Sequence, residues 1–276
     1  FCSMKTFADF GIDANPNSGQ VSATCPECSR DRRKKKVKCL SINTDEGVWC
    51  CHHCGWTGTL ANGSEKAVNL HWRKPKYRKP EKLVENNLTN GALEWLGDRG
   101  ISETTATDCG IYVSEVYMPQ SEEVKKAFVF PYFRDGELIN AKYRSGAKEF
   151  RSEVGAERIL YGLDDIKHDN GGEPVILVEG EMDKLSMWEA GFRSCVSVPD
   201  GAPHVNTKDY SSKFDFLNED RLEGKHFILA GDNDAPGQKL QEELARRLGK
   251  EVCSRVTWPE GCKDANDVLK EHGKKI

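Results

Sequence analysis

Hydrophobic and polar positions follow more than one pattern along this chain, and the clearest pattern covers residues 173–276. There, short apolar runs alternate with longer segments of helical character. Strands that alternate with helices in this way favour a mostly parallel sheet covered by helices. The predicted strands are 175–178, 195–198, 226–230 and 251–258, and the predicted helices are 183–190 and 237–248.

The middle of the chain shows the period-two alternation of a β-hairpin. Apolar and aromatic side chains alternate over 128–133, residues 134–137 offer a turn, and 138–144 resume as a strand. Before the hairpin, Leu93 and Leu96 stand three residues apart and predict a helix over 92–97.

The first sixty residues are rich in cysteines and turns, with short strands predicted at 40–43 and 48–50. The segment 72–80 then combines two prolines with dense positive charge, which opposes regular structure. We therefore expect a small cysteine-rich β domain over 1–60 and a basic flexible linker over 61–90. A basic subdomain over 91–172 and the α/β subdomain over 173–276 would follow.

Composition narrows the class of protein. A chain of 276 residues can form one large or two smaller cores. The net charge of −4, with 30% charged residues, gives no sign of the partner. No apolar segment is long enough to span a membrane, and the N-terminus lacks a secretory pattern. Eleven cysteines in so large and charged a chain favour metal binding in a reducing compartment over a disulfide scaffold.

Two CxxC pairs predict a zinc site. Cys25 and Cys28 form the first pair, and Cys51 and Cys54 form the second after a gap of 22 residues. Each pair places two thiolates in a tight turn, and two turns complete a tetrahedral zinc site. Four thiolates fill all the positions, so this zinc would be structural.

The choice of ligands remains open at this point. Cys39, Cys50, His52 and His53 lie close enough in the sequence to compete, and two unrelated CxxC turns are the other interpretation. Cys51 with Cys54 is favoured because its spacing and the following glycine match a zinc knuckle.

Positive charge is concentrated at 30–38, next to tryptophans inside the cysteine-rich unit. Lysines and arginines contact phosphates, and aromatic rings stack on the bases of single strands. A solvated loop is the other interpretation. The predicted contacts to nucleic acid in this unit are Arg33, Lys35, Trp49 and His53.

The hairpin supplies a second group of cations. Strand alternation places Lys142 and Arg144 on one face and Tyr143 on the other, and Lys148 and Arg151 follow. We expect the four cations to bind nucleic acid or nucleotide, although an ordinary solvent-exposed face of a hairpin has the same pattern.

Acidic clusters follow the predicted strands of the α/β region. Glu179 ends the first strand, Asp232 and Asp234 follow another, and Asp264 and Asp267 open the last helix. Carboxylates that gather at the ends of adjacent buried strands repel one another and need a cation. Mg²⁺ takes oxygen ligands from carboxylates and from substrate phosphates, so the pattern indicates phosphoryl chemistry. Solvated turn acids are the other interpretation.

Together these residues resemble a known family. The order Glu179-Gly180-Glu181, Asp232-Asn233-Asp234 and Asp264-Ala265-Asn266 is similar to the TOPRIM domain of primases, topoisomerases and recombination mediators. With the four-cysteine ribbon and the segments 159–163, 178–192, 196–203 and 244–250, it resembles the primase half of phage-type primase-helicases and plant organellar Twinkle proteins. The fold implied is α/β, with a small zinc-ribbon β domain tethered to a TOPRIM-containing α/β primase core.

The resemblance implies a DNA primase, which joins ribonucleoside triphosphates on single-stranded DNA. It implies catalytic roles for Glu179, Asp232 and Asp234, with Glu179 as general base or metal ligand. Mg²⁺ or Mn²⁺ would be bound by these three residues with Glu181, Asp183 and Asp264, and the zinc ribbon would select the template.

Partners and alternatives follow from the same resemblance. A replicative helicase, fused or separate, is an expected partner, because the chain contains no GxxxxGK[ST] loop of its own. The expected compartment is an organelle matrix for a plant protein and the host cytoplasm for a phage protein. A non-catalytic DNA-binding module is the main alternative, and a TOPRIM nuclease is a weaker one.

Overall fold

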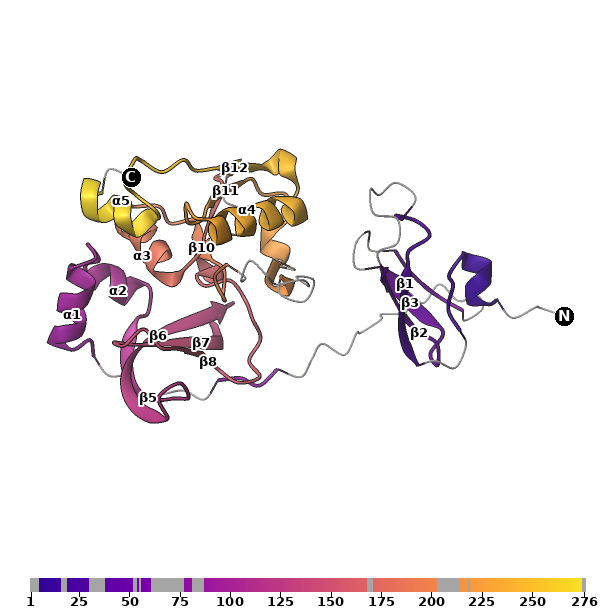
Figure 1. The fold of residues 1–276 in the computed structure, drawn as a ribbon, viewed down its shortest axis with the longest axis horizontal. Coiled ribbons are helices and arrows are strands. Elements are labelled where there is room, and N and C mark those ends of the chain that lie inside the picture. The colour runs from indigo at the N-terminus through magenta and orange to yellow at the C-terminus, as the bar shows by residue number, and fades with distance from the viewer. Residues whose placement is uncertain are drawn as a thin grey trace. The chain divides into compact units, whose positions relative to one another are not determined.

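The computed structural model describes residues 5–15, 19–29, 38–51, 54, 56–60, 77–80, 87–167, 171–202, 214–217 and 219–274. The chain divides into two compact units, Phe1–Lys74 and Pro75–Ile276 (Figure 1). None of the helices in the described part of the chain is long and apolar enough to cross a membrane.

The first unit is built on a four-stranded antiparallel sheet in the order β1-β2-β3-β4. Two of its strands, β2 and β3, confirm the predicted pair around the turn at Gly47, whose φ of 67° suits glycine. The two outer strands were not predicted, since they are short and poor in apolar residues. The bounds are β1 Gln20–Thr24, β2 Lys38–Asn43, β3 Val48–Cys51 and β4 Thr57–Thr59, after a 3₁₀ helix at Phe7–Phe10.

Trp49 is the centre of this unit's core. Its side chain is 2% exposed and packs against the rings of Phe7, Phe10 and Trp56. The prediction that Trp49 stacks on bases is therefore wrong, because its ring faces inward from β3. Arg33, Lys35 and His53, the other predicted nucleic-acid contacts of this unit, lie outside the described residues.

The second unit begins with two helices and an antiparallel sheet in the order β5-β6-β7-β8. The predicted hairpin is confirmed as β6 and β7 around Asp135 and Gly136, both with positive φ, and the predicted helix as α1. Helix α2 and strands β5 and β8 were not predicted. The bounds are α1 Asn90–Gly97, α2 Glu103–Asp108, β5 Tyr112–Met118, β6 Glu123–Arg134, β7 Glu137–Ser145 and β8 Phe150–Ser152.

A parallel four-stranded sheet, in the order β10-β9-β11-β12, follows in the same unit. It confirms the predicted alternation of strands and helices, although β12 is shorter than the predicted strand 251–258. The bounds are β9 Val175–Val178, α3 Glu181–Glu189, β10 Cys195–Ser197, β11 Phe227–Ala230, α4 Ala235–Leu248, β12 Cys253–Arg255 and α5 Ala265–His272.

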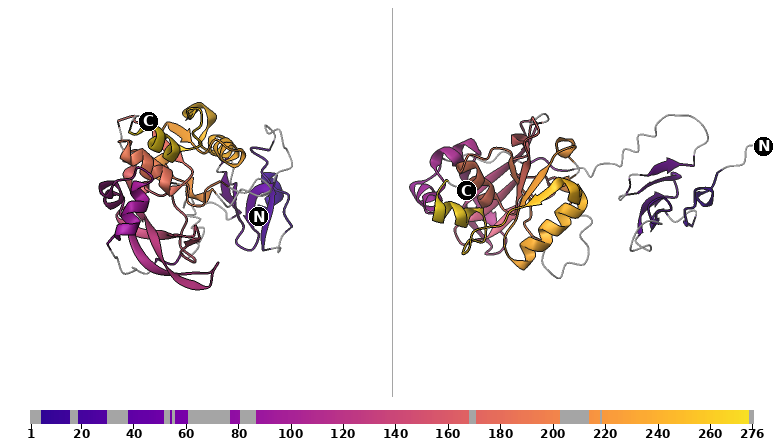
Figure 2. Two further views of the ribbon diagram at one scale, coloured as in Figure 1. Left: turned by 60° about the vertical axis from the view of Figure 1, so that its left-hand side comes forward. Right: turned by 90° about the horizontal axis from the view of Figure 1, so that it is seen from above.

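Both faces of the central strands β9 and β11 are covered, which explains why these strands are continuous apolar runs. Ile176 and Val178 join one core cluster with Met187 of α3 and Ala265 of α5. The alternate residues of β9 join the cluster that contains Leu240 and Leu244 of α4. Helices α3 and α5 lie side by side, whereas α4 lies beside β11 and β12 (Figures 1 and 2).

The two sheets of this unit share one core. Phe128, Phe130 and Tyr132 of β6 belong to the same buried cluster as Val175 and Leu177 of β9. The opposite face of β6 contributes Ala127 and Val129 to a separate small cluster with residues of β5 and β7. Side chains on β6 and β7 are therefore held at fixed positions relative to the ends of β9 and β11.

Residues 77–80 of the predicted linker 61–90 contact the rest of this second unit. The backbone N–H of Arg78 donates to the carbonyl of Gly155 at 2.8 Å, and Lys79 pairs with Glu137. The expectation of a flexible tether therefore does not hold over 77–80.

Candidate metal and nucleotide site

The acidic clusters meet at the point where the strand order of the parallel sheet reverses, between β9 and β11. From β9 the chain passes through α3 to β10 on one side, while β11 lies on the other side of β9. Such a switch point leaves an opening at the carboxyl ends of the two central strands. Val178 pairs with Ala230 across β9 and β11, so Glu179 and Asp232 emerge next to each other there.

Glu179 is only partly satisfied by the protein. Its Oε1 accepts the N–H of Ala202 at 3.1 Å, whereas Oε2 is buried and has no hydrogen-bond partner among the described residues. Burial, followed by repulsion from Asp232, raises the pKa of this carboxyl. An orphaned buried carboxylate oxygen at this position fits a ligand for a cation.

Asp183 lies beneath the same opening and is 8% exposed. Burial raises its pKa well above the ordinary value, and the charges of Asp264 and Asp232 add to the effect. The pKa of Asp264 is raised too, again chiefly by burial. A bound cation would stabilise the ionised forms of Glu179, Asp183 and Asp264 and so lower their pKa values.

Two of the acids also cap helices. Asp234 accepts the N–H of Gly237 at the start of α4, and Asp264 accepts the N–H of Asp267 at the start of α5, both at 2.9 Å. Each cap uses the Oδ1 atom of the carboxylate and does not involve Oδ2. The hydrogen bond from Gly237 also lowers the pKa of Asp234, so this residue stays ionised.

A lysine that the sequence did not single out completes this centre. The Nζ of Lys263 lies 2.6 Å from Oδ2 of Asp232 and 3.2 Å from Oδ2 of Asp234. Within the described residues, no three carboxylates of the site have oxygens within 4.8 Å of one another. The donor set is all oxygen, which suits Mg²⁺ or Mn²⁺ once the carboxylates close on the ion.

Glu181 is held by protein partners. Lys142 Nζ lies 2.8 and 3.1 Å from its two carboxylate oxygens, and the hydroxyl of Tyr132 donates to Oε1. The expectation that Glu181 binds metal and Lys142 binds nucleotide is therefore revised, because they form a buried ion pair between β7 and α3. Lys142 also donates to the carbonyl of Pro199, three residues before the N–H that holds Glu179.

The remaining predicted cations of the hairpin divide between the two faces of the sheet. Arg144 and Lys142 both lie over the ring of Phe150, as the strand alternation predicts. Lys148 is exposed in the turn between β7 and β8. Arg151 lies over Tyr143 on the opposite face and donates to the carbonyl of Tyr117, so it does not join the group.

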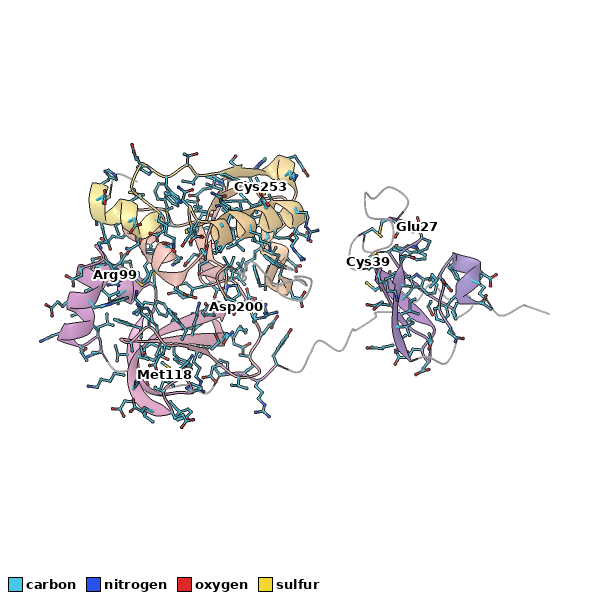
Figure 3. All side chains as sticks on the ribbon, in the orientation of Figure 1. Glu27, Cys39, Arg99, Met118, Asp200 and Cys253 are labelled. Carbon is cyan, nitrogen blue, oxygen red and sulfur yellow. The ribbon has the colours of Figure 1, made fainter. Side chains whose placement is uncertain are left out.

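Arg99 and Trp95 extend the basic face from α1, and neither was identified from the sequence. The guanidinium of Arg99 lies 3.6 Å from the centre of the Trp95 ring, and that of Arg144 lies 4.3 Å from it. Arg144 is 7% exposed, and its Nη1 has no hydrogen-bond partner in the described chain. Arg99 is labelled in Figure 3. Only the three-dimensional structure brings these residues together, since they are 45 positions or more from Arg144.

The four cysteines of the first unit form a second centre. The Sγ atoms of Cys25, Cys28, Cys51 and Cys54 all lie within 4.8 Å of one another, with Cys25–Cys54 and Cys28–Cys51 at 3.7 Å. Sulfurs about 2.3 Å from a tetrahedral zinc ion lie about 3.8 Å apart. The set can therefore hold zinc with little rearrangement.

Two of the competing ligands can now be placed. Cys39 Sγ lies 3.6 Å from Cys51 and 3.9 Å from Cys28, although it is outside the group of four (Figure 3). Cys50 lies opposite Ser41 in the antiparallel register of β2 and β3, and it is also outside that group. His52 and His53 lie outside the described residues.

Gly237 provides a test of how closely α4 approaches the site. A Cβ at this position would lie 2.3 Å from the carbonyl oxygen of Asp232, so Gly237→Ala must displace the aspartate loop. We expect a loss of about 1–3 kcal/mol in the free energy of unfolding, measured by urea denaturation. In Gly91→Ala the added methyl group meets nothing within 4 Å, and this control should be neutral or slightly stabilising. Equal effects of the two substitutions would contradict the close approach.

The buried acids predict how stability depends on pH. The pKa of Asp183 is raised in the folded chain above its unfolded value of about 3.9, so the folded chain keeps a proton that the unfolded chain has lost. Without Mg²⁺ or Mn²⁺, this contribution to stability is lost as the pH rises from about 4 through the raised pKa. Asp183→Asn should flatten the fall of melting temperature between pH 5 and pH 8, and the exposed control Glu242→Gln should not. An unchanged slope in Asp183→Asn would contradict the assignment.

The zinc ligands can be separated from their neighbour by substitution. Cys39 is placed to replace Cys28 or Cys51 but not Cys25, so Cys25→Ser should lose most of its zinc while Cys39→Ser keeps one ion per chain. The measurement is metal content by mass spectrometry after dialysis. Loss of zinc from Cys39→Ser would place that thiol in the ligand set.

Comparisons with known proteins agree with this geometry. A Toprim-like family model matches residues 176–269. The chain is 37% identical to the chloroplastic/mitochondrial Twinkle homolog of Arabidopsis thaliana, over 98% of this chain and 40% of that protein. A solved primase fragment of the bacteriophage T7 primase-helicase is similar in fold, with a TM-score of 0.53 and 24% identity over 91% of this chain and 95% of that one.

A second plant protein matches along most of its own length. The primase homolog protein of Arabidopsis thaliana is 36% identical, over 98% of this chain and 83% of its own. By contrast, the chain spans less than half of the Twinkle homolog. The sequence therefore belongs to the phage-type primase and plant Twinkle family, and it corresponds to the primase part.

Proposed function

We propose that this protein is a DNA primase, which makes short RNA primers from ribonucleoside triphosphates on single-stranded DNA. The observation that carries the proposal is the pair of Glu179 and Asp232 at the ends of adjacent parallel strands, with Glu179 Oε2 buried and unpartnered. A module that only binds DNA gains nothing from a carboxylate oxygen that is buried without a hydrogen-bond partner in the described chain. Membership in the primase family supports the same conclusion.

In this proposal Glu179, Asp232 and Asp234 hold the divalent ion with Asp183 and Asp264. The bound Mg²⁺ or Mn²⁺ would lower the pKa of the attacking 3′-hydroxyl and neutralise charge that develops on the phosphate. The 3′ oxygen forms a bond to the α-phosphorus of the incoming nucleotide, and the bond to the β-phosphate oxygen breaks, so that pyrophosphate leaves. The hydroxyl proton is proposed to pass to the carboxylate of Glu179, whose Oε2 has no hydrogen-bond partner in the described chain.

The basic side chains orient the substrates. Arg99 and Arg144, whose guanidiniums both lie against the ring of Trp95, and Lys148 in the adjacent turn are proposed to bind the phosphates of template and primer. Lys142 acts indirectly, because it joins Glu181 to the carbonyl of Pro199. It therefore fixes the loop whose N–H at Ala202 holds Glu179 in place.

The zinc unit is proposed to select the template, and its four thiolates to hold a structural zinc ion. It would be tethered to the primase core through the basic segment before Tyr77. A replicative helicase, fused or separate, is the proposed partner. Since the two plant relatives are 36–37% identical and one is named chloroplastic/mitochondrial, an organelle matrix is the proposed compartment.

Primer synthesis on a panel of single-stranded templates, with ribonucleotides and Mg²⁺ or Mn²⁺, tests the proposal. Asp232→Ala should reduce synthesis by at least about a hundredfold, because charge on the transferring phosphate is no longer neutralised. It should leave binding of single-stranded DNA within about twofold, because the basic side chains are untouched. The exposed-acid control Asp220→Ala should retain synthesis.

Two outcomes would overturn the proposal. If the unsubstituted chain binds single-stranded DNA but forms no dinucleotide on any template, the chain is a DNA-binding module. If Asp232→Ala keeps full synthesis, the metal centre has been assigned to the wrong residues.

A further inference from the structure

Lys263 occupies an unusual position for a surface lysine. Its ammonium bridges the two aspartates that follow β11, at 2.6 Å from Asp232 and 3.2 Å from Asp234. At Asp234 the ammonium contacts the oxygen that would be left for a metal, since the other oxygen caps α4. One positive charge therefore stands where the proposed site requires two.

The backbone fixes this lysine in place. Its N–H donates to Oδ2 of Asp267 at 3.0 Å, and its carbonyl accepts the N–H of Asn233 at 2.8 Å. The backbone of the residue is thus tied to the acidic loops on both sides, which keeps the start of its side chain next to the aspartates. The sequence places Lys263 directly before Asp264, which makes this arrangement part of the third acidic cluster.

The side chain is nevertheless free to leave. It is 49% exposed, whereas Asp232 beneath it is 13% exposed, so the ammonium lies at the mouth of the site. By contrast, Lys142 is 14% exposed and is held by Glu181 and Pro199 inside the unit. Lys263 can swing outward without a change in the backbone.

We propose that Lys263 is a counterion that neutralises the aspartates before substrate arrives and then moves to the triphosphate of the incoming nucleotide. This inference rests on the proposed function. A dication bound to Asp232 and Asp234 would repel the ammonium from the same oxygens. The nucleotide brings negative phosphates to that mouth, and a lysine on a flexible stem binds phosphate as a point charge.

The handover couples two ligands. Metal alone must displace the ammonium into water, whereas metal with nucleotide offers it a phosphate, so each ligand strengthens the binding of the other. The chain would therefore bind the free ion weakly and the ion with nucleotide well. Removal of the Lys263 ammonium should therefore change the affinities for the free ion and for the nucleotide in opposite directions.

The test uses the full zinc-loaded chain and needs no primer synthesis. Binding of Mn²⁺ without nucleotide is measured by electron paramagnetic resonance, and binding of ATP at saturating Mn²⁺ is measured by calorimetry without template. Lys263→Met should bind Mn²⁺ alone about tenfold more tightly and ATP about tenfold more weakly. Lys263→Arg keeps the charge and should leave the affinity for Mn²⁺ alone near that of the unsubstituted chain.

Controls separate this inference from the proposed function. Lys270→Met removes an exposed lysine from α5 and should change neither affinity. Asp232→Asn defines how much Mn²⁺ binds at the site. If Lys263→Met binds Mn²⁺ alone no more tightly, or loses affinity for both ligands, the counterion role is wrong and the metal site stands. If the unsubstituted chain binds no Mn²⁺ even with ATP, the proposed function fails as well.

Discussion

Repulsion between carboxylates is the constraint on which this centre depends. Glu179 and Asp232 leave adjacent parallel strands side by side, and Asp183 is buried beneath them against Asp264. The fold offsets this repulsion with backbone N–H donors and with the ammonium of Lys263, while burial and repulsion raise the pKa of Glu179. A divalent cation would take the place of the ammonium and would counter the rise in pKa. The same repulsion that strains the metal-free chain thus creates affinity for metal.

The antiparallel sheet β5–β8 of the second unit fixes the surroundings of these acidic residues. Because β6 contributes to the core that also holds β9, the side chains of β7 are fixed relative to the acids. The buried pair of Lys142 and Glu181 uses this rigidity, and it leads through Pro199 to the loop that holds Glu179. A buried ion pair adds little net stability when compared with apolar packing, although it fixes geometry. Its value here lies in the placement of Glu179, the carboxylate proposed to act in catalysis.

The sequence predicted the elements whose pattern is local, and it failed where partners are distant. Strands β9 and β11 and helix α4 follow from apolar runs and helical periodicity, and CxxC spacing is sufficient to indicate the thiolate cluster. Glu181 looked like a metal ligand because it lies in an acidic motif, but its partner Lys142 is 39 residues away on another sheet. Trp49 looked like a stacking ring because positive charge lies nearby in sequence, whereas strand alternation turns it into the core. Lys263 was not predicted, because a lysine next to aspartates is common in sequences and does not by itself indicate a site.

The acids differ in what they show about function. Asp234 and Asp264 cap helices, so a protein without catalysis would still gain stability from them. Their presence is weak support for an active site. Glu179 and Asp183 are different, because the Oε2 of one has no partner in the described chain and the other is buried among like charges. Each destabilises the metal-free fold, and an amide or apolar side chain would relieve the strain. These two residues, rather than the more visible aspartate motif, are therefore the structural features that best support the proposal of a divalent metal centre in this chain.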